Sequence, residues 1–411
     1  MRIAHSVTVP AVLLALLVPV VASAQVTTKA EGLSLNDTIV QLLKPISPAP
    51  VGEAVAFATG LEIATAPFGT TSGGFVFKLD PTTGLRVQSA STFGPTFAER
   101  ALTTGAGKMS VAANLTIATY DRLGDFSLSG MQLSSIKGAS NAVTRTGNAS
   151  LVMSSQTLVM TATAGITDDF DLGIAVPMVK VKVDGLSWVQ RADNVVALRA
   201  TGSGIASGLG DMALTAKYRF MKFGKDQPDP GGLAVSLVGH MPTGNRANLR
   251  GLGMYRALGS LIYSSGTGKF RPHGNVGFEW WEKGLTVQTS LSGATPYTTA
   301  ETRHMLQYAA GAEFEAAPKF TLLVDLLGRH YLGGGRIDTQ TFNMPSGLFP
   351  GVSTFDAAGV TDNSIRKISL VPGLKWNVKG TLLLALNARI PIGDNSLYDK
   401  FTPVLGVEWT F

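Results

Sequence analysis

The chain of 411 residues contains no cysteine, and that absence removes several classes of protein from consideration. Disulfide cross-links, cysteine nucleophiles and thiolate metal sites are all excluded. Long apolar runs are also missing: after the first residues, no stretch approaches the roughly 18 consecutive apolar residues of a membrane-spanning helix. Charge of one sign is not concentrated either, because 34 basic and 28 acidic residues are interspersed along the chain. No nucleic-acid partner is therefore predicted.

Apolar residues are nevertheless abundant, at 45% of the chain. Two architectures dilute them in this way. One is a large soluble all-β or α/β protein with an ordinary core, and the other is a barrel that turns every second residue toward lipid.

The first 25 residues, MRIAHSVTVPAVLLALLVPVVASAQ, differ from the rest. One early cation, a short apolar run and the small-x-small sequence Ala22-Ser23-Ala24 predict a cleaved signal peptide over residues 1–24. A membrane anchor is the alternative, but Pro10 and Pro19 interrupt the run. We therefore expect an exported protein.

Alternation with a period of two dominates the chain after residue 100. In DMALTAKYRFM (211–221), for example, Leu214, Tyr218 and Phe220 share one face while Lys217 and Arg219 share the other. Such a segment is a strand with one polar face. The pattern predicts an all-β fold: a transmembrane antiparallel up-and-down β-barrel of about 14 strands (12–16). The expected strands are 88–98, 107–119, 125–137, 152–164, 170–183, 211–221, 231–241, 254–264, 270–282, 305–315, 319–330, 365–376, 380–391 and 402–411.

Short and long connections alternate between these strands. Short ones fall at 121–124, 167–169, 316–318 and 377–380. Long ones fall at 138–150, 184–210, 242–253, 283–304, 331–363 and 392–401. Outer-membrane barrels have short periplasmic turns and long outer loops, which favours that class over a soluble sandwich.

Aromatic residues are expected at the periplasmic edge of this threading, where they would form an interface girdle. Its predicted members are Phe126, Phe170, Phe220, Phe270, Phe314, Phe320, Trp376 and Trp409, with Tyr120 and Tyr263 at the same edge. The last strand ends on Phe411. We expect that strand to pair with the first, and Phe411 to act as the assembly signal for the outer-membrane insertion machinery.

Charged residues on the opposite parity are predicted to line the lumen: Lys217, Arg219, Arg271, Glu279, Glu313, Glu315, Asp325, Arg329 and Arg389, with Lys375 and Glu408 beside them. Opposite charges in a confined lumen tend to pair, because an isolated charge there is costly. They can hold the interior together, or they can form a polar lining that selects solutes.

Residues 25–87 fit the barrel less well, and the barrel itself is expected over 88–411. Ser34 and Asp37 predict a helix start, and the spacing of Leu35, Ile39 and Leu42 continues a short amphipathic helix until Pro45. An extended linker should follow. The segment is either a plug in the lumen or a periplasmic tether, and a hairpin near 75–84 would raise the strand count to sixteen.

The stretch GLGDMALTAKYRF (208–220) resembles the outer-membrane proteins of the MetA pathway of phenol degradation, which are related to FadL-like transporters. FGPTFAERALTTGAGKMSVAAN (93–114), MPTGN (241–245), RPHGNVGFE (271–279) and LVDLLGR (323–329) are similar to the same family. The resemblance implies a barrel that assists uptake of small hydrophobic or aromatic compounds. Its partners would be these solutes, outer-membrane lipid and the insertion machinery.

Motifs for other chemistry are sparse. Four histidines follow the predicted signal peptide, and none has zinc-site spacing, so neither a metal nor a cofactor is expected. Asp168, Asp169 and Asp171 crowd one turn and fit a solvated turn better than a calcium site. An outer-membrane lipid hydrolase, with His240 or His330 as its base, and a structural or secretion-associated barrel are the rival functions. The expected mechanism is passive passage from the outer loops, chiefly 333–359, through the lumen or a lateral gap.

Overall fold

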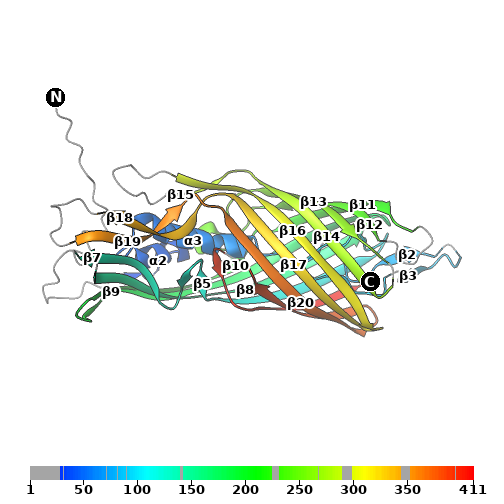
Figure 1. Cartoon of the computed structure of the whole chain (residues 1–411). Helices are drawn as coiled ribbons and strands as arrows, with labels where there is room; N and C mark the ends of the chain where they lie inside the picture. The colour runs from blue at the N-terminus through cyan, green and yellow to red at the C-terminus, as the bar shows by residue number, and fades with distance from the viewer. Residues whose placement is uncertain are drawn as a thin grey trace, which may run out of the picture.

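A closed antiparallel barrel dominates the computed structural model, which describes residues 28–30, 32–70, 72–80, 82–88, 90–138, 142–224, 231–266, 268–288, 299–343, 352–393 and 395–411 (Figure 1). Its wall has 12 strand positions, because β10 and β11 follow one another along β9. The wall strands are β4 (Met109–Tyr120), β8 (Val143–Gly165), β9 (Phe170–Arg191), β10 (Val196–Leu209), β11 (Ala213–Lys222), β12 (Gly232–His240), β13 (Arg256–Ser264), β14 (Phe270–Trp281), β16 (Thr299–Ala317), β17 (Phe320–Gly333), β20 (Ile365–Lys379), β21 (Leu382–Pro391) and β23 (Thr402–Thr410).

The last wall strand closes the barrel against the first. β23 and β4 pair from Val404 opposite Thr116 to Thr410 opposite Ser110. Beyond that pairing, Phe411 and Met109 exchange two backbone hydrogen bonds of 2.8 Å. The short connections at 166–169, 318–319 and 380–381 lie at this same end of the barrel. The pairing of β23 with β4 closes the ring of wall strands.

Two of the 14 expected strands are not part of the wall. Of the expected strand 88–98, residues 90–98 lie inside the barrel, where apolar residues such as Phe93 and polar ones such as Thr92 are buried alike, so the alternation did not mark a lipid-facing strand. The segment 125–137 contributes β6 (Phe126–Ser127) and β7 (Met131–Gly138), which lie beyond the loop end of β4. The remaining 12 give the even number typical of single-chain bacterial barrels.

The wall continues past the barrel at the end opposite the C-terminus. β8, β9 and β10 extend there, and β18 (Arg336–Asn343) and β19 (Val352–Thr361) join them through the pairing of β19 with β7. The expectation of a loop over 184–210 was therefore wrong. The outer face of this extension mixes exposed charged residues, such as Lys182 and Asp184, with exposed apolar ones, such as Ile205.

Short elements complete the two ends of the wall. β5 (Arg122–Leu123), β6 and β22 (Leu397–Tyr398) form a small sheet, and β15 (Leu285–Gln288) extends the pairing of β16. β1 (Thr28–Ala30) pairs in parallel with β10. The connection between β12 and β13 holds a short 3-10 helix, η1 (Arg246–Asn248).

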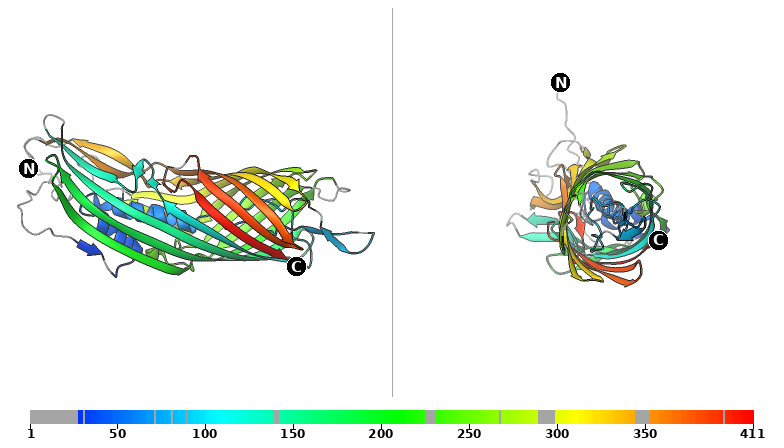
Figure 2. Two further views of the ribbon diagram at one scale, coloured as in Figure 1. Left: turned by 90° about the horizontal axis from the view of Figure 1, so that it is seen from below. Right: turned by 90° about the vertical axis from the view of Figure 1, so that its right-hand side faces the viewer.

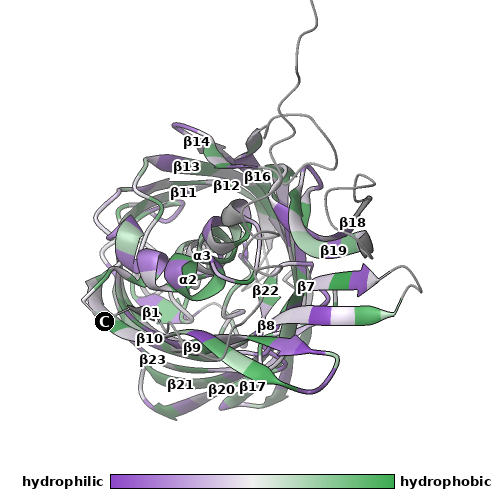
Figure 3. Ribbon diagram, turned by 90° about the vertical axis from the view of Figure 1, so that its left-hand side faces the viewer, coloured by the Kyte–Doolittle hydropathy of each residue, from purple (hydrophilic) through white to green (hydrophobic). Residues whose placement is uncertain are grey.

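Two helices lie inside the barrel, as the end-on views show (Figure 2, Figure 3). The first, α2 (Leu35–Leu43), begins where the sequence predicted, with the Ser34 hydroxyl accepting a hydrogen bond of 3.2 Å from the Asp37 amide. The second, α3 (Ala49–Ala64), replaces the extended linker that Pro45, Pro48 and Pro50 suggested. Proline is tolerated in the first turn of a helix, and Pro50 lies there, so these prolines open α3 instead of preventing it.

A hydrophobic core fixes the helices within the extended end of the barrel. Residues of α2 such as Ile39, Leu42 and Leu43 are fully buried, as is Val55 of α3. They pack against inward-facing residues of β4, β7, β8 and β9, including Ala118, Ile136, Met153, Val181 and Val183. This packing holds the N-terminal segment in the lumen.

After α3 the chain runs down the lumen, leaves it and returns. β2 (Phe77–Leu79) and β3 (Arg86–Gln88) form a hairpin that projects beyond the C-terminal end of the barrel (Figure 1, Figure 2). The hairpin considered near 75–84 thus forms, but it is separate from the wall. Residues 90–104 then re-enter the lumen and lead to β4.

Candidate functional site

The charged residues expected in the lumen lie on the inner face of the wall. Glu315 is half-buried, and the other eight are at most 9% exposed: Lys217, Arg219, Arg271, Glu279, Glu313, Asp325, Arg329 and Arg389. They are buried because the N-terminal segment fills the space between them, not because the wall closes on itself. Several of them contact this segment directly, whereas Arg219, Glu279 and Asp325 bond to other residues of the wall or to the turn at 168–169.

Lys217, Arg271 and Glu313 contact the returning segment 90–104. The Lys217 ammonium lies 3.3 Å from the Glu99 carboxylate and also donates to the Arg100 carbonyl. Glu313 accepts a hydrogen bond of 2.9 Å from the Gly94 amide, and Arg271 donates to the Ser91 hydroxyl at 3.1 Å. Charge-assisted hydrogen bonds of this kind are stronger than neutral ones, so the segment is firmly placed.

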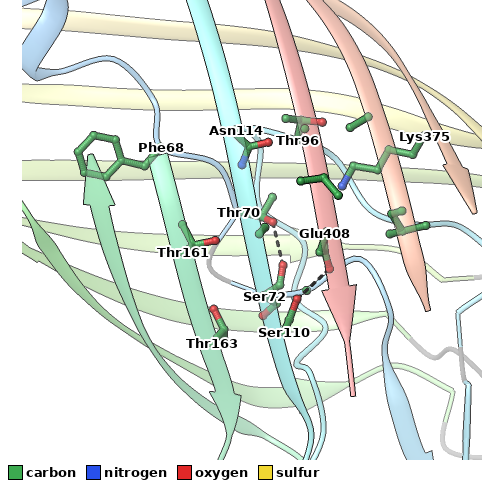
Figure 4. Close-up of a pocket in the computed structure, with 16 residues that line it drawn as sticks. Phe68, Thr70, Ser72, Thr96, Ser110, Asn114, Thr161, Thr163, Lys375 and Glu408 are labelled. Atoms are coloured by element: carbon green, nitrogen blue, oxygen red, sulfur yellow. Dashed lines mark hydrogen bonds between the residues drawn. The ribbon is translucent and has the colours of Figure 1, made fainter. Parts of the chain in front are cut away.

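A second group of contacts lies where segment 72–74 crosses β4 and β23 (Figure 4). Glu408 accepts hydrogen bonds from the Gly74 amide and, at 3.0 Å, from the Ser110 hydroxyl. A Cβ atom at Gly73 would lie 2.7 Å from the Ser110 Cβ atom. The close approach of the segment to the wall therefore requires glycine at this position.

The end of α3 contacts three cations of the wall. The Glu62 carboxylate lies 2.6 Å from the Lys367 ammonium, 2.7 Å from the Arg389 guanidinium and 3.4 Å from that of Arg329. Burial alone would raise the pKa of Glu62, but these three cations together hold it at about 2. Glu62 is therefore ionised at neutral pH.

Sequence reasoning missed Glu62 and Lys367. Glu62 stands on a helix that was not expected, and nothing in its local sequence signals a partner in a strand some 300 residues further on. Lys367 shares the inward parity of its strand with Lys375, so the alternation could have identified it.

Cavities of very different size lie along the lumen. The largest of three, about 540 Å³, is at the loop end, between α2, α3, the connection 241–255 and β15. Its lining combines the apolar Val40, Phe57 and Leu252 with Asp37 and Arg246. Two deeper cavities measure about 90 and about 30 Å³. Pockets for small molecules have volumes of roughly 300–1,000 Å³, so only the first of these three is large enough for an aromatic solute.

Wall strands β12 and β13 end beside the largest cavity. The strands β10 and β16 extend further toward the loop end than β12 and β13 do. The connection 241–255, which joins β12 to β13, lies in the part of the wall that these two shorter strands do not reach. Asp211 holds this connection in place, because its carboxylate accepts hydrogen bonds of 3.1 Å from the Gly244 amide and 3.0 Å from the Leu252 amide. The cavity is thus bounded on its outer side by one anchored loop.

The two histidines considered as hydrolytic bases do not stand with an acid partner. His240 packs against Phe68 with ring centroids 5.3 Å apart, and its Nδ1 atom has no hydrogen-bond partner among the described residues. His330 lies on the outward parity of β17. A histidine–carboxylate pair occurs elsewhere: His273 lies 2.7 Å from Asp325 inside the barrel. Within the described ranges, no group of three metal-ligating side chains occurs.

The outer face of the wall is apolar over a limited band. Along β9, Leu172, Ile174 and Met178 are exposed, and the next outward residues are Lys180 and Lys182. No helix in the described part of the chain is long and apolar enough to cross a membrane.

Aromatic side chains border this band at the C-terminal end of the barrel. Phe270 pairs with Phe314 across two strands, and the rings of Phe320 and Trp376 stack with centroids 5.8 Å apart. The expected girdle residues that are exposed at this end are Phe220, Phe270, Phe314, Phe320, Trp376 and Trp409, with Phe170 partly exposed.

Phe126 and Tyr120 are the exceptions. β4 begins at the C-terminal end of the barrel, so both residues lie beyond its middle, toward the opposite end. Phe126 packs against the core around the helices, and Tyr120 is buried with its hydroxyl 2.9 Å from that of Ser155. The turn at 121–124 is thus not on the side of the other short turns.

Residues 133–325 match the model of a family described as the putative MetA pathway of phenol degradation. The resemblance noted in the sequence is thereby confirmed over that part of the chain. A comparison with curated proteins gave no match.

Several solved outer-membrane structures are similar to this chain. An outer membrane channel from Pseudomonas putida F1 is 14% identical, with 76% of this chain and 98% of that one covered and a TM-score of 0.45. A Pseudomonas aeruginosa FadL homologue is 11% identical, with coverage of 85% and 98% and a TM-score of 0.33. The Ralstonia pickettii toluene transporter TbuX is 10% identical, with 75% of this chain and 90% of that one covered and a TM-score of 0.24.

Proposed function

We propose that this protein is an outer-membrane channel for the passive uptake of small hydrophobic or aromatic compounds. One observation carries the proposal: a closed barrel has an apolar band outside and charged side chains inside, the reverse of a soluble protein. Lipid is the solvent that makes this arrangement stable. The family match over 133–325 adds the class of solute.

In the proposed mechanism the solute first occupies the cavity at the loop end and then passes the N-terminal segment. The cavity of about 540 Å³ accepts a single aromatic ring with its substituents. The deeper cavities of about 90 and about 30 Å³ do not, so passage requires α2, α3 or the segment 65–104 to move. Residues 25–87 would thus act as a plug, and the solute would leave through the lumen or through a lateral gap beside the connection 241–255.

Localisation and assembly follow from the same proposal. Residues 1–24 would direct export and be removed, although they lie outside the described residues. The insertion machinery would recognise the last strand through Phe411, and the aromatic rim would lie at the periplasmic interface of the outer membrane of a Gram-negative bacterium. Lipid would contact the apolar band.

A hydrolase and a purely structural barrel are the alternatives. A hydrolytic base is normally oriented by a neighbouring acid, and neither His240 nor His330 has such a partner among the described residues. The cavity at the loop end favours transport over a structural role, because a barrel that carries no solute does not need it.

The proposal can be tested by uptake of labelled toluene at low concentration into intact cells that lack other hydrophobic-compound channels. Cells that produce the full chain should take up toluene faster than cells with an empty vector. Uptake of a polar solute of similar size, such as glycerol, serves as the control for a leaky membrane. Equal toluene uptake with and without the protein would contradict the proposed function.

A further inference from the structure

The negative end of α3 faces a group of cations on the barrel wall. Its last carbonyls, those of Ala64 and Thr65, accept hydrogen bonds of 3.0 Å from Arg256 and 2.7 Å from Arg329. The helix has no basic residue of its own in its last turn. A helix C-terminus carries a partial negative charge, so the wall supplies the complementary charge from outside the helix.

Three of these cations surround a single carboxylate. We use the name cation site for three residues that come from neighbouring strands and all contact Glu62: Arg329 of β17, Lys367 of β20 and Arg389 of β21. All four side chains are at least nine-tenths buried. Asp399 is the next acid, and burial raises its pKa, so it is a weaker source of negative charge.

The cation site would be unfavourable without an anion in it. Arg329 and Lys367 are direct cross-strand partners in the register of β17 and β20. Like charges directly opposite one another destabilise a sheet, and buried charges without a counterion are costly. The barrel wall therefore contains a preformed anion site, and the N-terminal segment provides its occupant.

An apolar surface connects this site to the cavity at the loop end. Leu252 and Leu285 line that cavity and also belong to a buried cluster with Trp281 and Tyr331. The Tyr331 hydroxyl lies 3.3 Å from the Arg329 guanidinium. A solute that moves inward from the cavity thus meets an apolar cluster first and the cations next.

We propose that the cation site binds the carboxylate of a hydrophobic acid, and that Glu62 is an internal competitor that the acid displaces. The inference rests on the proposed function and narrows its solute to amphipathic carboxylates. Displacement exchanges one carboxylate for another, so the cations remain paired while α3 is released. An uncharged analogue has no group to replace Glu62 and leaves α3 in place.

The test uses the full chain reconstituted in liposomes, with labelled benzoate and labelled benzamide as probes of similar shape and different charge. Glu62→Gln removes the internal carboxylate and should increase the affinity for benzoate by about tenfold (~1.4 kcal/mol), without a matching change for benzamide. Asp193→Asn is the control, since Asp193 is an exposed carboxylate that lines neither the cavity at the loop end nor the cation site. It should change neither affinity.

A second variant tests the site from the other side. Arg389→Gln removes one cation and should weaken benzoate binding by about tenfold while benzamide binding stays the same. If Glu62→Gln fails to assemble, as judged by the loss of heat-modifiable gel migration, the comparison of wild type with Arg389→Gln decides alone. Equal benzoate affinity in these two proteins would overturn the proposal.

Other outcomes are equally decisive. Equal gains for benzoate and benzamide in Glu62→Gln would mean that α3 is merely loosened, and would overturn a carboxylate site. Inorganic sulfate that binds as tightly as benzoate would show a bare anion site and contradict the hydrophobic acid. Toluene uptake by wild-type cells distinguishes a failure of the proposed channel function from a failure of the proposed role of Glu62. If toluene uptake is absent, the channel function is contradicted. If uptake is present but the benzoate affinities of the variants are unchanged, only the role of Glu62 is contradicted.

Discussion

Glu62 and Lys367 form an ion pair with a distance of 2.6 Å between Oε2 and Nζ, and both side chains are almost fully buried. This contact joins α3 to strand β20 of the barrel wall. Because Arg329 and Arg389 share the same carboxylate, one residue of the N-terminal segment is connected to three wall strands. The behaviour of the channel should therefore depend strongly on this residue.

The first prediction concerns the pH dependence of closure. Glu62 has a folded-state pKa of about 2, below its ordinary 4.5, so its ion pairs contribute stability above pH 4.5 and lose it as the pH falls through about 2. Glu62 should therefore stay ionised between pH 5 and 8, so that conductance in planar bilayers is constant over this range and rises as the pH approaches 2. Glu62→Gln should lack this acid step. A step near neutral pH that vanishes in Glu62→Gln would refute the assignment.

The second prediction uses the absence of cysteine from the chain. The Thr59 hydroxyl of α3 lies 3.9 Å from the Met153 sulfur of β8. A double variant, Thr59→Cys with Met153→Cys, should form a disulfide on oxidation and hold α3 in the lumen. Toluene uptake should then fall toward the empty-vector rate and return on reduction.

Each single cysteine variant is the control for this experiment and should transport normally under both conditions. Undiminished uptake by the cross-linked protein would mean that solutes pass without movement of α3.

The third prediction concerns the core that holds α2. Leu42 is fully buried against the wall, and Leu42→Ala should destabilise the docked segment by about 2–5 kcal/mol. Proteolysis of residues 28–64 in folded protein should become faster, while heat-modifiable migration of the barrel persists. Leu33→Ala, at a 44% exposed position just before the helix, should have little effect. Equal protection in both variants would show that the helices are not held by this core.

The fourth prediction concerns the loop beside the large cavity. Asp211→Asn removes the charge that accepts hydrogen bonds from the Gly244 and Leu252 amides, and should cost about 1–3 kcal/mol locally. Tryptic cleavage after Arg246 and Arg250 should therefore accelerate. Asp193→Asn, at an exposed carboxylate, is the control. Unchanged cleavage would show that Asp211 does not anchor the loop.

The fifth prediction tests the lipid-facing band. Leu405 is exposed in the middle of β23, and Trp409 is exposed near its end. Leu405→Lys should cost about 2–4 kcal/mol of folding free energy in liposomes, whereas Trp409→Lys should cost about 0–1 kcal/mol in charge burial. Denaturant titrations in lipid measure both. Equal costs would place the hydrocarbon elsewhere on the wall.

The sequence by itself determined the wall of the barrel and one helix. The period of two, with its apolar outer parity, is a local property of each strand, and it located 12 of the wall strands but not β10, which lies in the expected loop 184–210. The Ser34 cap and the spacing of Leu35, Ile39 and Leu42 are local in the same sense, and they located α2. Local patterns could not exclude 88–98, because alternation also occurs in a segment that is buried on every side.

Only the tertiary structure decided what fills the lumen and how it is held. Glu62 contacts Arg329 and Arg389 across 267 and 327 residues of sequence, and no local pattern reports such a distant pairing. The buried length of α3 is likewise a consequence of the space that the barrel encloses. The wall follows from each strand's contact with its solvent, whereas the plug and its ion pairs follow from contacts that exist only once the barrel has closed.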